Sequence, residues 1–145
     1  MELTIDQALQ QGLAAHKEGK LQDAERLYRA ILQAQPKHPD ANHNLGVLAV
    51  AVGKPLEAVP LFKLALEANN QIEQFWLSYI DTLITVGRFD EAKRALVKAQ
   101  KSGVSSETLD ALNQRLQASV TNDTDKIEKG QTLSEKRKKI AEKKK

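Results

Sequence analysis

The chain of 145 residues contains no cysteine, four prolines, seven glycines and 4% aromatic side chains. Without cysteine there can be no disulfide, no thiolate-bound metal and no thiol catalysis, which fits a reducing compartment such as the cytoplasm. The scarcity of proline and glycine, beside many Ala, Leu, Lys, Glu and Gln residues, favours helix along most of the chain. The composition therefore predicts an all-α protein.

Long apolar runs are also absent. No segment approaches the roughly 18 apolar residues that a membrane-spanning helix needs. The start, MELTIDQALQQG, lacks the basic and apolar stretches of a secretory signal, so we expect a cytoplasmic protein. The net charge of +3 is unevenly distributed: residues 119–145 hold nine Lys or Arg and five Asp or Glu, against 13 and 14 in residues 1–118. The basic character belongs to the C-terminal segment.

Three segments repeat one pattern: EGKLQDAERLY (18–28), VGKPLEAVPLF (52–62) and VGRFDEAKRAL (86–96). Each copy follows the previous one by 34 residues, and Gly12 aligns with Gly46 in the same register. The aligned structural positions are Gly19, Gly53 and Gly87; Ala24, Ala58 and Ala92; Tyr28, Phe62 and Leu96. This periodicity predicts three tandem units, at about 5–38, 39–72 and 73–106.

Each unit reads as two helices joined by a short turn. Thr4 and Gln7 form a capping-box pattern at the start of the first helix. Glycine suits the left-handed residue that ends this helix, and an acid follows in the first turn of the second. So short a turn requires antiparallel packing. The aligned Ala of each unit has a small side chain that lets the two helices approach. The aligned Tyr, Phe or Leu fills the space beside it.

The 34-residue unit resembles the tetratricopeptide repeat, whose pattern is W-x2-L-G-x2-Y, A-x3-F and P. The matching residues are Leu45-Gly46 and Ala58-x3-Phe62 in the middle unit, Gly12, Ala24-x3-Tyr28 and Pro36 in the first, and Trp76 and Ala92-x3-Leu96 in the third. The resemblance covers residues 5–106. It implies an α-solenoid, a right-handed superhelix whose first helices line a concave face.

A capping helix should follow the third unit. In residues 107–120, Leu109, Leu112 and Leu116 form one apolar stripe, preceded by the possible caps Ser105 and Ser106. Such a helix would cover the open end of the stack, so residues 1–120 form the predicted domain. Residues 121–145 are expected to be a basic linker or tail, either disordered or a solvated helix.

No catalytic or metal site is expected. The sequence lacks G-x-S-x-G, H-E-x-x-H and G-x-G-x-x-G, and no Gly-Lys pair is followed by Ser or Thr. His38, Asp40 and His43 lie close in sequence, but no further ligand has suitable spacing, so they are interpreted as polar surface or groove residues. The chain is predicted not to be an enzyme and to need no cofactor or small-molecule substrate.

The concave face implied by the resemblance is the predicted binding groove for a protein segment. Its residues are Asp6, Leu9, Leu13, His16, Asp40, His43, Asn44, Val47, Val50, Gln74, Leu77, Asp81 and Ile84. An apolar floor with intermittent acids suits a helix or extended segment with apolar anchors and basic residues, from a partner or a second copy of this chain. The alternative is that several of these side chains are buried between repeats or beneath the cap helix.

Some relatives of this family grip a partner's terminal carboxylate with Lys, Asn, Asn, Lys and Arg. The corresponding positions here are Leu9, Leu13, Asn44, Gln74 and Ser78, of which Asn44 alone matches. We therefore expect no carboxylate clamp.

Two other functions remain open. The repeats resemble bacterial arrays that precede glycosyl-, sulfo- or methyltransferase domains, so the chain could be the N-terminal recognition module of a longer enzyme. Alternatively, the segment SEKRKKIAEKKK could tether the protein to nucleic acid or an anionic membrane. We do not expect this tethering, because such a basic run is more often a solvated linker, and no aromatic residue lies within it to stack on the bases of a nucleic acid.

Overall fold

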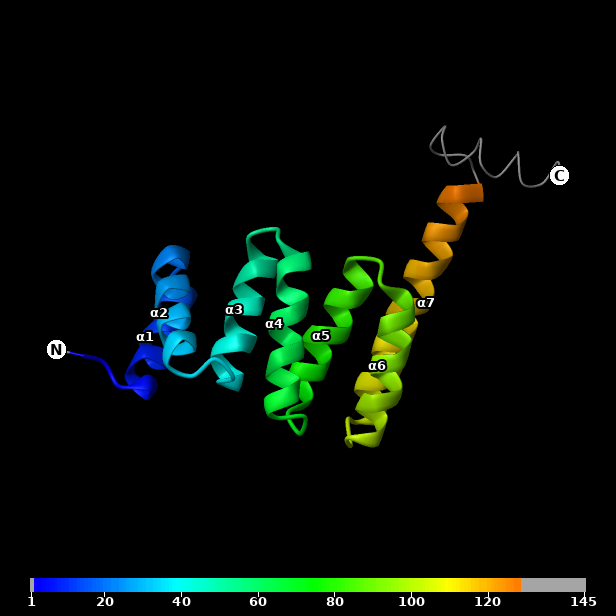
Figure 1. Ribbon diagram of the computed structural model, residues 1–145. Coiled ribbons are helices and arrows are strands. Elements are labelled where there is room, and N and C mark those ends of the chain that lie inside the picture. Colours follow the sequence, from blue (N-terminus) through cyan, green and yellow to red (C-terminus); the bar gives the residue numbers. More distant parts are fainter. Residues whose placement is uncertain (1, 129–145) are drawn as a thin grey trace.

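The computed structural model describes residues 2–128, in which all regular structure is helical. The helices are α1 (Ile5–Lys17), α2 (Leu21–Ala34), α3 (Pro39–Ala51), α4 (Pro55–Ala68), α5 (Glu73–Thr85), α6 (Phe89–Lys101) and α7 (Ser106–Glu128). They stand side by side in chain order, with α1 and α7 at opposite ends of the row (Figure 1). This arrangement confirms the predicted all-α solenoid.

The helix boundaries follow the sequence register. The first helices of the three units begin at Ile5, Pro39 and Glu73, and the turns before the second helices contain Gly19, Gly53 and Gly87. These glycines have φ of 81°, 82° and 81°, a left-handed conformation that residues with a Cβ rarely adopt. At the N-terminus, the Thr4 hydroxyl accepts the Gln7 N–H at 3.0 Å, and the Gln7 side chain accepts the Thr4 N–H at 2.9 Å.

Within each unit a bulky residue of the second helix packs on a specific position of the first. A Cβ placed on Gly46 would lie 2.5 Å from the Phe62 ring, and one on Gly12 would lie 2.6 Å from the Tyr28 ring. The third unit has Ile80 and Leu96 at the aligned positions, so a larger residue on the first helix accompanies a smaller one on the second. The packed volume is thus shared differently in this unit.

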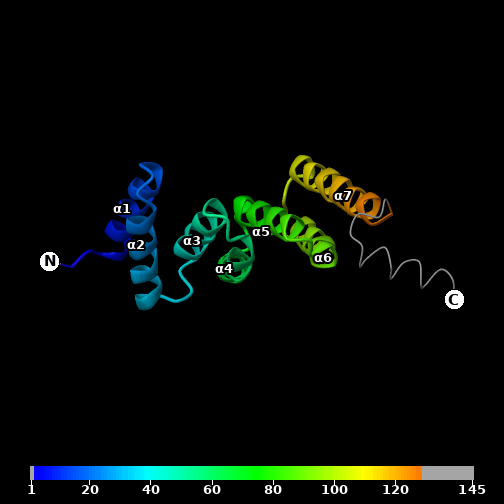
Figure 2. The same ribbon diagram turned by 90° about the horizontal axis from the view of Figure 1, so that it is seen from above.

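The stack curves because successive helices lie closer together on one side than on the other. Contacts join α1 to α3, α3 to α5 and α5 to α7. No Cα atom of α2 comes within 8 Å of α4, nor any of α4 within 8 Å of α6. Viewed from above, α4 and α6 lie along one side of the row (Figure 2). We call the side formed by α1, α3 and α5 the first-helix face, and the side formed by α2, α4 and α6 the second-helix face. The first-helix face is the inner side of the curve.

The seventh helix covers the open end of the stack. Its residues Leu109, Leu112 and Leu116 are buried against α5 and α6, and the Ser105 hydroxyl accepts the Thr108 N–H at 3.3 Å at its start. The expected cap helix ended at residue 120, whereas α7 continues to Glu128. The remainder of the expected tail, residues 129–145, lies outside the described residues.

Candidate functional site

The predicted groove residues lie on α1, α3 and α5, the three helices of the first-helix face, but their accessibility differs. The exposed members are Asp6, Leu13, Asp40, Val50 and Gln74. The half-buried members are Leu9, His16, Asn44, Val47, Leu77 and Asp81. The other two, His43 and Ile84, are 8% and 3% exposed and offer almost no surface to a partner.

His43 is a packing residue between two repeats. Its ring stacks on Phe75 at a centroid distance of 4.7 Å and lies 5.3 Å from the Phe62 ring. Its Nε2 is 2.8 Å from the Ser78 hydroxyl, which joins α3 to α5. Burial lowers the pKa of His43, although Asn44 and Asp40 act in the opposite direction. The imidazole therefore favours its neutral form and contributes to the core.

The C-terminal end of the groove is occupied by α7. Ile84 belongs to the same core cluster as Leu112 and Leu116. Asp81 Oδ1 forms an ion pair with Arg115 Nε at 2.8 Å. Because Asp81 already has a partner within the chain, this part of the groove is less available for binding than its two N-terminal units.

A second set of contacts joins the beginnings of α5 and α7. The Glu73 carboxylate accepts the Ser105 N–H at 3.1 Å and is also hydrogen-bonded to the Thr108 hydroxyl. These hydrogen bonds, that from Thr108 most of all, lower the pKa of Glu73. The helix α7 is thus attached at the start of α5 as well as near its end.

The N-terminal two thirds of the face retain an exposed apolar surface. Leu13 on α1 and Val50 on α3 are 38% and 41% exposed, and these two helices contact each other. Two carboxylates, Asp6 and Asp40, are exposed on the same helices. No Lys or Arg occurs in α3 or α5, so little on this face could hold an anion.

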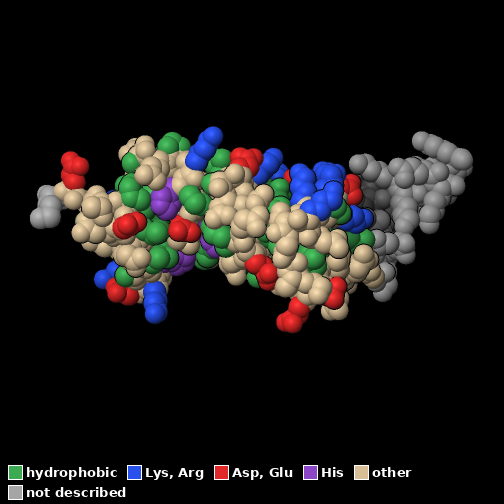
Figure 3. Space-filling model, turned by 90° about the horizontal axis from the view of Figure 1, so that it is seen from below, with side chains coloured by type: hydrophobic (Ala, Val, Ile, Leu, Met, Phe, Trp, Pro, Cys, Tyr) green, Lys and Arg blue, Asp and Glu red, His purple; other side chains and the backbone are tan. Residues whose placement is uncertain are grey.

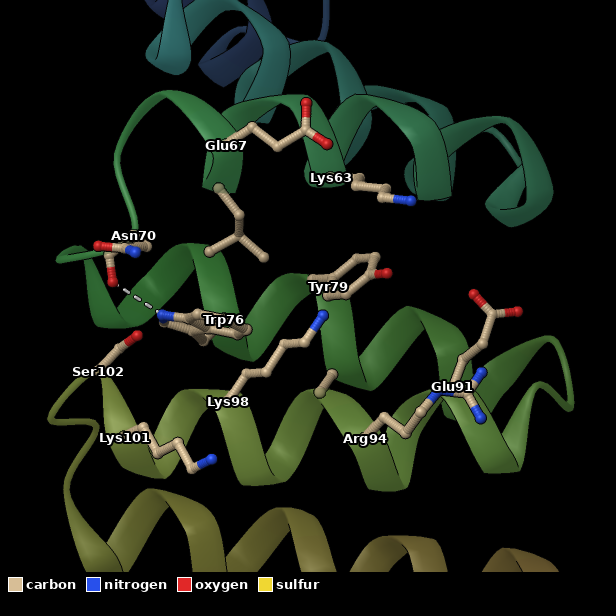
Figure 4. A pocket seen from close by; sticks show the side chains of 12 residues that line it. Lys63, Glu67, Asn70, Trp76, Tyr79, Glu91, Arg94, Lys98, Lys101 and Ser102 are labelled. Atoms are coloured by element: carbon tan, nitrogen blue, oxygen red, sulfur yellow. Dashed lines mark hydrogen bonds between the residues drawn. The ribbon is translucent and has the colours of Figure 1, made fainter.

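Sequence reasoning missed a furrow on the second-helix face. It lies between α4 and α6, has α5 as its floor, and encloses a cavity of about 550 Å³. Figure 4 shows Trp76 and Tyr79 of α5 at its floor, Lys63 on the α4 wall, and Arg94 and Lys98 on the α6 wall. Arg94, Lys98 and Lys101 are spaced so that they share one helix face, and this spacing was the sequence signal that could have indicated the furrow.

The charge distribution differs along the molecule. Seen from below, histidines lie among hydrophobic side chains toward the N-terminal helices, whereas Lys and Arg gather at the upper right, where α6 lies (Figure 3). No group of three or more His, Cys, Asp or Glu side chains suited to a metal ion occurs within the described part of the chain. None of the described helices combines the length and apolar character of a membrane span.

Comparison with known proteins bears on the family. The sequence model described as tetratricopeptide repeat matches residues 9–71. No curated protein matches the chain significantly. The first such repeat domain of Spaghetti (RPAP3), bound to the HSP90 peptide SRMEEVD, is 20% identical with a TM-score of 0.66; the alignment covers 77% of this chain and 89% of that chain.

Two further structures share the architecture. The Yersinia enterocolitica type III secretion chaperone SycD, in complex with a peptide of the translocator YopD, has 18% identity and a TM-score of 0.66, covering 84% of this chain and 93% of that chain. Thermobaculum terrenum O-GlcNAc transferase has 21% identity and a TM-score of 0.65, covering 80% of this chain but 23% of that chain. Such identities show the fold alone. The sequence-model match identifies tetratricopeptide repeats over residues 9–71, and the 34-residue register and helix pairs continue the same repeat architecture through the third unit.

Proposed function

We propose that this protein is a non-enzymatic interaction scaffold that binds a segment of a partner protein on its first-helix face. The observation that carries the proposal is the exposure of Leu13 and Val50 on two contacting helices of that face. Half-buried Leu9 and Val47 lie on the same helices and extend the apolar surface. Exposed apolar residues grouped on one side of a protein are typical of a contact site.

The charges of this face indicate the character of the partner segment. Asp6 and Asp40 are exposed beside the apolar residues, and no cation is present on α3 or α5. A segment with apolar anchors and neighbouring Lys or Arg residues would therefore be complementary. In the structures of RPAP3 and SycD, similar folds are bound to peptides, which supports a peptide-binding role here.

Selection from a random peptide library displayed on phage would test the proposal. We expect the enriched peptides to combine large apolar residues with Lys or Arg. Substituting Leu13→Glu and Val50→Glu together should raise the Kd of an enriched peptide at least about tenfold, because loss of an interface anchor costs roughly 1–2 kcal/mol or more. Both side chains are accessible, so far-UV circular dichroism should be unchanged.

The matched control places the same substitution on the opposite face. Leu56, at the start of α4, is 60% exposed, and Leu56→Glu should leave peptide binding intact. Equal enrichment on the wild type and the Leu13→Glu, Val50→Glu variant would refute the proposed location. Concentration-dependent dimerisation that the same variant abolishes would identify a second copy of the chain as the occupant.

A further inference from the structure

The furrow between α4 and α6 combines an apolar floor with a positively charged rim. Its floor is apolar: Trp76 and Ala95 are buried and Tyr79 is half-buried. The Trp76 indole N–H donates to the Asn70 carbonyl at 2.9 Å, which orients the ring at the base of the cavity. A cavity of about 550 Å³ with this floor can accept one large apolar or aromatic side chain.

Four cations surround this floor. Lys63 lies on α4, and Arg94, Lys98 and Lys101 lie on α6, all of them exposed. Among residues 2–123, no carboxylate oxygen lies within 4.0 Å of any of these four side chains. Two acids, Glu67 and Glu91, also line the cavity, so its lining carries a net charge of +2. Glu91 already pairs with Arg88 at 3.8 Å.

The helix dipole explains part of this charge but not all. Lys98 and Lys101 lie in the last turn of α6, where cations are favoured. Lys63 and Arg94 lie in the interior of their helices, where the dipole has little effect. The helix dipole therefore does not account for these two cations, which lie on opposite walls of the furrow.

The preceding repeat provides an internal comparison. The equivalent furrow, between α2 and α4 with α3 as its floor, has a cavity of about 440 Å³. Its lining contains two cations, Arg29 and Lys54, and two acids, Glu25 and Glu57. Arg29 is already paired with Glu25 at 2.8 Å. A furrow of this fold can therefore be neutral, and of these two furrows the one between α4 and α6 carries the net positive lining.

We propose that the α4–α6 furrow binds an acidic peptide segment that carries one aromatic or large apolar side chain. The apolar side chain enters the cavity against Trp76 and Tyr79, and flanking carboxylates lie against Lys63 on one wall and Arg94 and Lys98 on the other. A tyrosine hydroxyl is protonated at neutral pH and can donate to a carboxylate, and burial raises the pKa of Tyr79 further. This site is on the opposite face from the proposed groove and accepts a partner of opposite charge.

The single tryptophan of the chain provides a direct assay, since Trp76 lines the cavity. The probe is a short synthetic peptide of Asp and Glu residues with one central Phe. Titration of the full chain at low salt should change the tryptophan emission, and added salt should weaken binding because exposed charge pairs are screened. The same peptide with Ala in place of Phe should bind more weakly.

Charge reversal tests the assignment to this furrow. Arg94→Glu with Lys98→Glu should raise the Kd about tenfold. Two cations are reversed together because each exposed ion pair contributes little by itself. The control, Arg29→Glu with Lys54→Glu, changes the net charge equally in the equivalent furrow and should leave the Kd unchanged. Should the first variant fail to fold, Lys63→Gln on the α4 wall still tests the site and should also weaken binding.

Three results would overturn the proposal: no change in tryptophan emission with the acidic peptide, equal loss of binding in both charge-reversal variants, or equal affinity for the Phe and Ala peptides. Binding of inorganic polyphosphate in place of the peptide would also overturn it, in favour of a phosphate ligand. Leu13→Glu with Val50→Glu should not affect this assay. The furrow proposal is therefore tested independently of the groove on the first-helix face.

Discussion

The packing of Gly46 against Phe62 allows a prediction in which two opposing effects can be separated. Replacing glycine by alanine inside a helix normally stabilises it by about 1 kcal/mol. At position 46, however, the new methyl group would lie 2.5, 2.8 and 3.0 Å from three carbons of the Phe62 ring. The Phe62 side chain is 1% exposed, so the ring is enclosed by other residues, and overpacking of this kind costs about 1–3 kcal/mol. We therefore expect Gly46→Ala to reduce the free energy of unfolding by up to about 2 kcal/mol.

A smaller residue at position 62 should reverse the sign of this effect. The third unit combines Ile80 with Leu96 at the aligned positions, so a Leu on the second helix leaves room on the first. In a Phe62→Leu background, Gly46→Ala should stabilise the protein, because the helix-propensity gain remains and the contact is relieved. The coupling energy of this double-mutant cycle should lie between about 1 and 3 kcal/mol.

Urea denaturation followed by far-UV circular dichroism would measure the wild type and the three variants of the cycle. Ala30→Gly, at an exposed position inside α2, calibrates the Ala–Gly difference in this scaffold, expected at about 1 kcal/mol. If Gly46→Ala stabilises the protein while Phe62 is present, the contact does not restrict position 46 and the reasoning fails.

Two further predictions concern α7 and His43. Leu116 is 1% exposed, so Leu116→Ala should lower the unfolding free energy by about 2–5 kcal/mol. Arg115→Ala should cost less than about 1 kcal/mol in the same denaturation assay, because its pair with Asp81 is solvent-accessible; the reverse order would contradict apolar attachment of α7. The lowered pKa of His43 means that the unfolded chain binds a proton more readily than the folded one. Its contribution to stability is therefore complete above its ordinary pKa of 6.5 and declines as pH falls below that value. In His43→Gln the urea midpoint should no longer fall for this reason as the pH is lowered. If the urea midpoint of His43→Gln depends on pH as that of the wild type does, the assignment is refuted.

Much of the fold could be predicted from local and periodic features. The spacing of Gly19, Gly53 and Gly87 predicted where each first helix ends, since left-handed backbone strongly favours glycine. The leucine stripe after residue 106 predicted a cap helix, because a stack of repeats leaves an apolar end face. The cap helix was predicted to end at residue 120, and helix beyond it was only one of two alternatives, because those residues have no apolar stripe to decide between helix and disorder.

The surface was less predictable than the fold. His43 occupies the same register position as Leu9 and Leu77, which suggested the groove. Its burial results from Phe62 and Phe75, which belong to different helices and enclose the ring. Ile84 is similarly covered by a helix that begins more than twenty residues later along the chain. The groove itself remains a prediction.

The sequence by itself determined the number of units, the helix pairs, their turns and the likeness to the tetratricopeptide repeat, because these depend on short-range patterns repeated in a constant register. Only the tertiary structure decided which side chains remain accessible and where the surface is hollowed. The α4–α6 furrow exists because first helices approach each other more closely than second helices do, and this curvature brings Lys63, Trp76 and Arg94 around one cavity. Such a juxtaposition depends on the packing of successive repeats, which no local pattern of residues encodes.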